Sequence, residues 1–119
     1  MADVVKNEII TLVDKELEAA IEKFGLNHSN HESFAVIKEE IDEAHEALAK
    51  VDYHQSCIWN ATKSNTTTPP VIRGLYAKAY SDAINLAVEA IQVAAMARKA
   101  IVSNVEITEI KKGGTDHGI

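Results

Sequence analysis

Residues 33–48 read SFAVIKEEIDEAHEAL, a stretch whose apolar and acidic residues follow the spacing of an α-helix. The apolar positions recur every three or four residues, which predicts an amphipathic helix: Phe34, Ile37, Ile41, Ala44 and Leu48. We expect this helix to begin near Asn30 or His31, with Ser29 or Asn30 as its cap, because short polar side chains satisfy the first free N–H groups. It should run to about Asp52 or somewhat beyond.

Two more helical segments flank this stretch. The spacing of apolar residues over 3–24 predicts a first helix, which Gly25 should end. Hydroxyl, amide and proline side chains over 60–70 predict an exposed loop, because they compete with helical hydrogen bonds. A third helical region should span 71–104, with a bend or break near 74–82, since 34 residues exceed the usual helix length.

These segments predict an all-α fold, because no hairpin signal is present. We expect an antiparallel bundle of three to five helices in a single domain over residues 1–110, followed by a flexible tail over 111–119. Three principal helices leave an apolar flank uncovered, so we expect oligomerisation to complete the core as a homodimer or homotetramer.

Composition limits the classes of function. The chain has 119 residues and a net charge of −6, which argues against binding a nucleic-acid polymer. The most apolar window, Ala83 to Val102, carries too many polar side chains for a membrane span, and the N-terminus shows no signal peptide. A single cysteine, Cys57, allows no disulfide within the chain, so a cytoplasmic location is the simplest expectation.

Five acids crowd the opening stretch: Glu39, Glu40, Asp42, Glu43 and Glu46. Glu40 and Glu43 lie three residues apart, so both project from one side of the helix and repel each other. A divalent cation would convert that repulsion into coordination. The plainer alternative is a solvated acidic face that keeps the protein soluble.

The third helical region carries a matching polar stripe. Asp82, Asn85, Glu89 and Gln92 follow at spacings of three, four and three within an otherwise apolar sequence. Packing the Glu89 face against Glu40 and Glu43 brings three carboxylates together, and their hard oxygen atoms suit Mg²⁺, with Mn²⁺ as a second option. Alternatively, Asn85 and Gln92 form hydrogen bonds between helices of a bundle.

The stretch His31 to Ala44 resembles the first motif of MazG-like proteins, in the all-α nucleoside triphosphate pyrophosphohydrolase superfamily. Its EExxE pattern is matched by Glu39, Glu40 and Glu43. Residues 90–97 look like the second motif region of short, phage-type members. The resemblance covers roughly residues 28–102.

This resemblance implies an Mg²⁺-dependent hydrolase that converts a nucleoside triphosphate to the monophosphate and pyrophosphate. Glu39, Glu40 and Glu43 would then be the catalytic acids. The metal ligands would be Glu40, Glu43, Glu89 and Gln92, of which Glu89 matches the glutamate of the second motif, ExxD. We expect Asp82, Asn85 and Lys78 to contact the substrate.

Two departures from the family pattern support an alternative function. Gln92 stands where the family has an aspartate, and the segment between the motifs is longer. The alternative is a catalytically weak or inactive MazG-like oligomer that acts as a nucleotide-binding or interaction module.

Other residues carry weaker signals. Asp42 and His45 resemble half of a di-iron motif, but no second copy exists. The histidines His28, His31 and His54 could touch a ligand, but we expect them as caps or solvated residues, and Cys57 as a partly buried thiol. Trp59 is expected at a packing contact rather than on a base. The cations closest to the acidic motifs should pair with acids or lie in solvent, although one or two could meet phosphate: Arg73, Lys78, Arg98 and Lys99.

Overall fold

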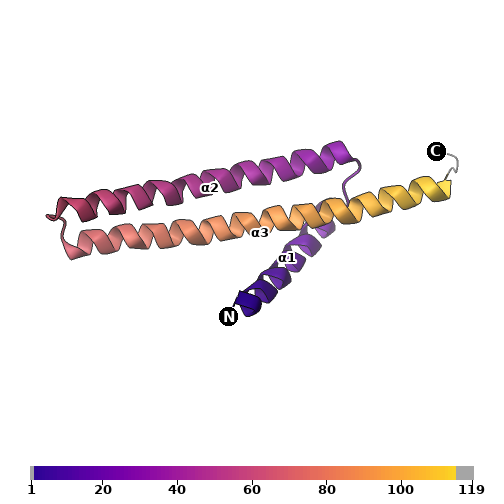
Figure 1. The fold of residues 1–119 in the computed structure, drawn as a ribbon. Coiled ribbons are helices and arrows are strands. Elements are labelled where there is room, and N and C mark those ends of the chain that lie inside the picture. The colour runs from indigo at the N-terminus through magenta and orange to yellow at the C-terminus, as the bar shows by residue number, and fades with distance from the viewer. Residues whose placement is uncertain (1, 115–119) are drawn as a thin grey trace. The chain divides into compact units, whose positions relative to one another are not determined.

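The computed structural model describes the backbone of residues 2–114 and the side chains of residues 2–104. This part of the chain forms three α-helices and no strand: α1 (Ala2–Phe24), α2 (Asn30–Ser64) and α3 (Pro69–Gly114) (Figure 1). The all-α prediction is confirmed. Residues 111–114 of the expected tail continue α3, and residues 115–119 lie outside the described residues.

The link between α1 and α2 follows from local chemistry. Gly25 has φ of 74°, a left-handed conformation that suits glycine, and its N–H donates to the Ile21 carbonyl at 2.7 Å. Ser29 Oγ accepts the Glu32 N–H at 3.1 Å, and the Glu32 carboxylate accepts the His28 N–H at 3.2 Å. The predicted stop at Gly25 and the predicted cap at Ser29 are both confirmed.

The loop between α2 and α3 is shorter than the expected 60–70, because α2 continues to Ser64 and α3 begins at Pro69. Thr62 and Ser64 donate hydroxyl bonds to the carbonyls of Ile58 and Ala61, at 2.7 and 2.9 Å, within the last turns of α2. These side chains therefore bond along the helix instead of interrupting it.

The break expected near 74–82 is absent, because α3 runs without interruption from Pro69 to Gly114. Two prolines open the helix, where no N–H partner is needed, and the Thr68 carbonyl accepts from Val71 and Ile72 at 3.1 and 3.2 Å. A Cβ added at Gly74 would meet no atom within 4 Å, so no close packing requires a glycine there. Compared with alanine, this glycine lowers helix stability by about 1 kcal/mol.

The chain divides into two compact units. The first unit combines Met1–Glu40 with Ile91–Ile119, and the second is Ile41–Ala90. The prediction of a single domain over residues 1–110 stays a prediction.

The first unit has a small interior made from all three helices. Val13 and Leu17 of α1 and Ala95 of α3 are its buried apolar residues among the described side chains. Polar contacts hold the chain after α1: the Asn27 N–H donates to Ser103 Oγ at 2.9 Å, and Asn27 Nδ2 donates to Ser33 Oγ at 2.8 Å. All three of these polar residues are buried, so the contacts are shielded from water.

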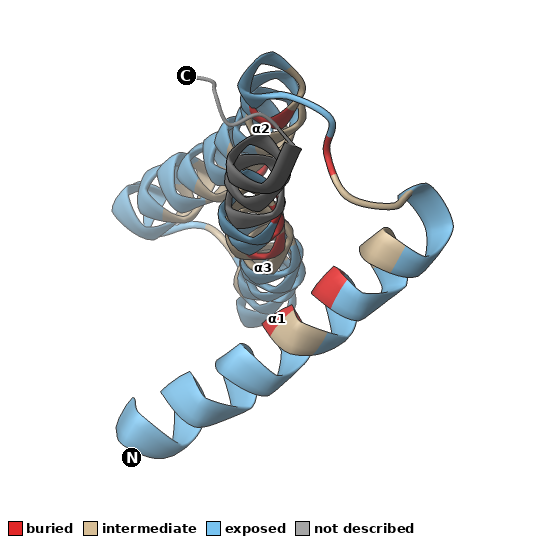
Figure 2. Cartoon of the chain, turned by 90° about the vertical axis from the view of Figure 1, so that its right-hand side faces the viewer, coloured by how far each residue is buried: buried red, intermediate tan, exposed pale blue. Residues whose placement is uncertain are grey.

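The second unit is a hairpin, in which the later part of α2 runs antiparallel to the earlier part of α3 (Figure 1). Its buried apolar residue is Ala47. Figure 2 shows how few positions along the described helices are buried. Among the described residues, no helix combines the length and the apolar character needed to cross a membrane.

Candidate metal site

The hairpin unit contains a polar cavity of about 350 Å³. Both helices line it with polar side chains, together with Ala47: Glu43, Glu46 and Lys50 from α2, and Asp82, Asn85 and Glu89 from α3. Helical spacing explains the set, since each helix presents positions three or four residues apart to its neighbour. The stripe predicted for the third helix is thus placed beside the acids of the second.

Glu43 and Glu89 lie close together across this hairpin. One carboxylate oxygen of each lies within 4.8 Å of the other, a distance at which two negative charges repel by roughly 1–3 kcal/mol. Together with Glu40, one turn earlier on α2, they make up the group of described acids that could hold a metal ion. Three of the four predicted ligands therefore belong to one group.

A buried oxygen distinguishes this group from an ordinary acidic surface. Glu89 Oε2 is shielded from water and has no hydrogen-bond partner among the described residues. A buried carboxylate oxygen without a donor is costly, and a small cation placed among the carboxylates would satisfy it. Anionic oxygen atoms are also the donors that Mg²⁺ and Mn²⁺ prefer.

Asp82 has a partner that the sequence did not suggest. Its carboxylate contacts Nδ1 of His54, and both side chains are largely buried. His54 was expected as a cap or a solvated residue, and that expectation is wrong. The contact orients Asp82, which lines the cavity together with Asn85.

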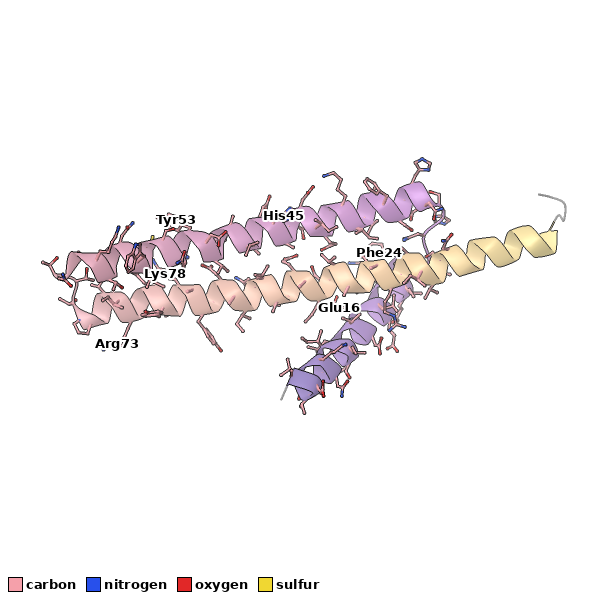
Figure 3. The ribbon with its side chains drawn as sticks, in the orientation of Figure 1. Glu16, Phe24, His45, Tyr53, Arg73 and Lys78 are labelled. Carbon is pink, nitrogen blue, oxygen red and sulfur yellow. The ribbon has the colours of Figure 1, made fainter. Side chains whose placement is uncertain are left out.

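The cation of this cavity is Lys50 rather than Lys78. Lys50 lines the cavity and lies seven residues after Glu43, so it shares a face with that acid. Lys78, labelled in Figure 3, is exposed and is not part of the lining. The spacing from Glu43 could have identified Lys50 from the sequence.

Gln92 and Glu39 belong to a different cavity. They line a pocket in the first unit, to which Glu40 also contributes. Gln92 thus lines a different described cavity from that of Glu43 and Glu89, its expected companions in metal binding. Its role as a ligand stays a prediction.

Several other residues named in the sequence analysis contact protein groups outside the cavity of the hairpin unit. Arg98 forms an exposed ion pair with Asp14, and pairing with an acid is one of the two surroundings expected for it. Cys57 is partly buried, as predicted. A hydrogen bond with Cys57 raises the pKa of the Tyr53 phenol.

Hydrogen bonds from the His28 backbone and ring lower the pKa of Glu32. Trp59 is exposed, with the Lys63 ammonium 5.5 Å from its ring centre.

Comparison with known proteins gives no identification. No protein-family model matches the chain, and neither a curated protein nor a solved structure matches it significantly.

Proposed function

We propose that the chain is an Mg²⁺-dependent nucleoside triphosphate pyrophosphohydrolase with a MazG-like helical fold. The observation that carries the proposal is the closeness of Glu43 and Glu89, together with the buried and unpaired Oε2 of Glu89. In the reaction, water adds to the α-phosphorus and the bond to the bridging oxygen breaks. The products are the nucleoside monophosphate and pyrophosphate.

Each residue has a defined task in this proposal. Glu40, Glu43 and Glu89 hold the metal ion, which, when bound, neutralises phosphate charge and lowers the pKa of a water molecule. Asp82 and Asn85 offer hydrogen-bonding groups in the same cavity, and Lys50 offers a positive charge for phosphate oxygens. Glu39 and Gln92 line the cavity of the first unit, and their expected roles in catalysis and metal binding stay predictions.

An assay of pyrophosphate release tests the proposal. Purified protein would be incubated with Mg²⁺ and each common ribo- and deoxyribonucleoside triphosphate. We expect turnover that chelation abolishes and that the Glu40→Ala, Glu43→Ala double variant lowers at least a hundredfold. Asp52→Asn is the matched control, because Asp52 is exposed on the same helix and lines neither cavity. Unchanged turnover in the double variant would refute the assignment.

The alternative is a binding module that keeps the fold without turnover. Gln92 favours it, because an amide stands where the family pattern has a carboxylate. Thermal unfolding with and without Mg²⁺ and nucleotide separates the two functions. Ligand at a hundred times its Kd adds about 2.7 kcal/mol of stability, so a raised melting temperature without pyrophosphate release would favour the module.

We also propose that the protein works as a homodimer or homotetramer, because the hairpin unit exposes large apolar side chains. Tyr76, Tyr80, Ile84 and Val88 follow every fourth position of α3, and each is between 46% and 72% exposed. Ile41 and Leu48 of α2 are exposed as well. Polar residues line the cavity inside the hairpin, whereas these apolar residues lie outside it. A second copy would cover a surface of this kind.

A further inference from the structure

The first unit contains a cavity of about 440 Å³, a volume typical of sites for small molecules. All three helices line it: Glu16 and Phe24 come from α1, Glu39 from α2, and Met96 and Lys99 from α3. The reaction proposed above leaves this space without a ligand.

Lys99 is the decisive residue of this cavity. Its side chain lines the cavity and is 4% exposed, yet among the described residues it forms no hydrogen bond or ion pair. The ring of Phe24 has its centre 5.8 Å from Nζ, and the positive charge of Lys99 also contributes to lowering the pKa of Glu32. Lys99 therefore gives the cavity a positive charge that an acceptor of a ligand could meet.

The charge of the lining selects the type of ligand. Four glutamates surround the single lysine: Glu16, Glu32, Glu39 and Glu40. A phosphate group would be repelled by this lining, and a simple organic cation would leave Lys99 without an acceptor. A neutral ring satisfies both kinds of residue if it has acceptors on one edge and N–H donors on another.

We infer that this cavity binds a guanine base, an inference that rests on the proposed function only in choosing nucleotides as the ligand class. Guanine offers O6 and N7 as acceptors, a pair that lysine recognises. Its N1–H and N2 amino group are adjacent donors that fit the two oxygen atoms of one carboxylate, and the other common bases lack this pair of donors. Phe24 and Met96 supply apolar surface for the faces of the ring.

Glu16 and Glu39 are the acceptors best suited to the amino edge. Glu32 is already engaged, since its carboxylate accepts hydrogen bonds from the backbone and ring of His28. Glu40 belongs to the group that could hold a metal ion. Both Glu16 and Glu39 are exposed side chains, so changing them should not disturb folding.

Calorimetric titration of the full-length chain with nucleosides, without Mg²⁺, tests this inference. We expect guanosine to bind at least tenfold more tightly than adenosine, cytidine or uridine. Inosine lacks only the 2-amino group and should bind about tenfold more weakly than guanosine, because part of a bidentate contact is lost. Equal affinity for all nucleosides, or no measurable binding of guanosine, would overturn the inference.

Three variants identify the contacts. Lys99→Met keeps the length of the side chain, removes its charge and should weaken guanosine binding at least tenfold. The Glu16→Gln, Glu39→Gln double variant should weaken it about as much and keeps the test valid if Lys99→Met fails to fold. Lys78→Met is the control, because Lys78 is exposed and lies outside the lining. Unchanged binding in both cavity variants would overturn the assignment.

The test is independent of hydrolysis, because guanosine has no phosphate. Guanosine binding without pyrophosphate release from any triphosphate would refute the proposed activity and leave the guanine site standing. Pyrophosphate release without preference for guanine, combined with no binding of guanosine, would refute the guanine site alone.

Discussion

The two units of the chain differ in how their polar residues are paired. In the first unit, buried Asn27 donates hydrogen bonds to Ser103 and Ser33, which stabilise the packing, although its own Oδ1 accepts none among the described residues. In the hairpin unit, Glu43 and Glu89 face each other as like charges, and Oε2 of Glu89 has no donor among the described residues. Polar groups that cost stability in the absence of a ligand are typical of functional sites.

The apolar residues differ between the units as well. The first unit buries Val13, Leu17 and Ala95, whereas the hairpin buries Ala47 and exposes its larger apolar side chains. We therefore attribute self-association to the hairpin, whose large apolar side chains are exposed, and expect the apolar core of the first unit to contribute more to stability.

The largest expected effect is the loss of self-association when the exposed apolar residues of the hairpin are made charged. Sedimentation velocity at micromolar concentration should show the wild-type chain as a dimer or tetramer. The Ile84→Asp, Val88→Asp double variant should shift it to the monomer, because two charges would be buried in an apolar contact. Lys78→Asp, exposed on the same helix, should leave the assembly unchanged. A wild-type chain that sediments as a monomer would contradict this side of the comparison.

A smaller effect sharpens the role of the first unit. Ser103→Ala removes the acceptor of the buried Asn27 N–H and should lower the free energy of unfolding by about 1–3 kcal/mol. Asn104→Ala, next in the chain and exposed, is the control and should change stability by no more than about 0.5 kcal/mol. Urea unfolding measures both variants. If Ser103→Ala is as stable as the wild type, the hydrogen bond between Asn27 and Ser103 does not stabilise the first unit.

The smallest expected effect concerns Glu32, at the start of α2. Hydrogen bonds from His28 lower its pKa in the folded chain below the ordinary value of 4.5. Its contribution to stability is therefore present above that value and is lost as the pH falls through the lower folded pKa. The stability difference between wild type and Glu32→Gln, measured by urea unfolding, should be small at pH 7 and should shrink as the pH falls below 4.5. A difference that grows on acidification would contradict the assigned direction.

Local patterns explain what the sequence could predict. The apolar spacing, the stop at Gly25 and the cap at Ser29 all depend on neighbouring residues, and each is confirmed. The closeness of Glu43 and Glu89 was also accessible, because both lie in stripes with helical spacing. The length of α2 was not, because the hydroxyl groups of Thr62 and Ser64 can either end or continue a helix.

Tertiary contacts explain most of what the sequence missed. Asn27 and Ser103 are 76 residues apart, and no local pattern connects them. The contact between His54 and Asp82 depends on the register of the hairpin, which the misplaced loop over 60–70 obscured. Lys99 was treated as a surface cation because burial of a charged side chain is uncommon.

Binding of Mn²⁺ to the wild-type chain and to Glu89→Gln, measured by electron paramagnetic resonance, tests the central claim most directly. We predict saturable binding to the wild type that Mg²⁺ displaces, and at least tenfold weaker binding to the variant. Without metal, Glu89→Gln should also melt a few degrees higher, because the repulsion between Glu43 and residue 89 disappears. Equal Mn²⁺ affinity in the two proteins, or no saturable binding to the wild type, would contradict the metal site.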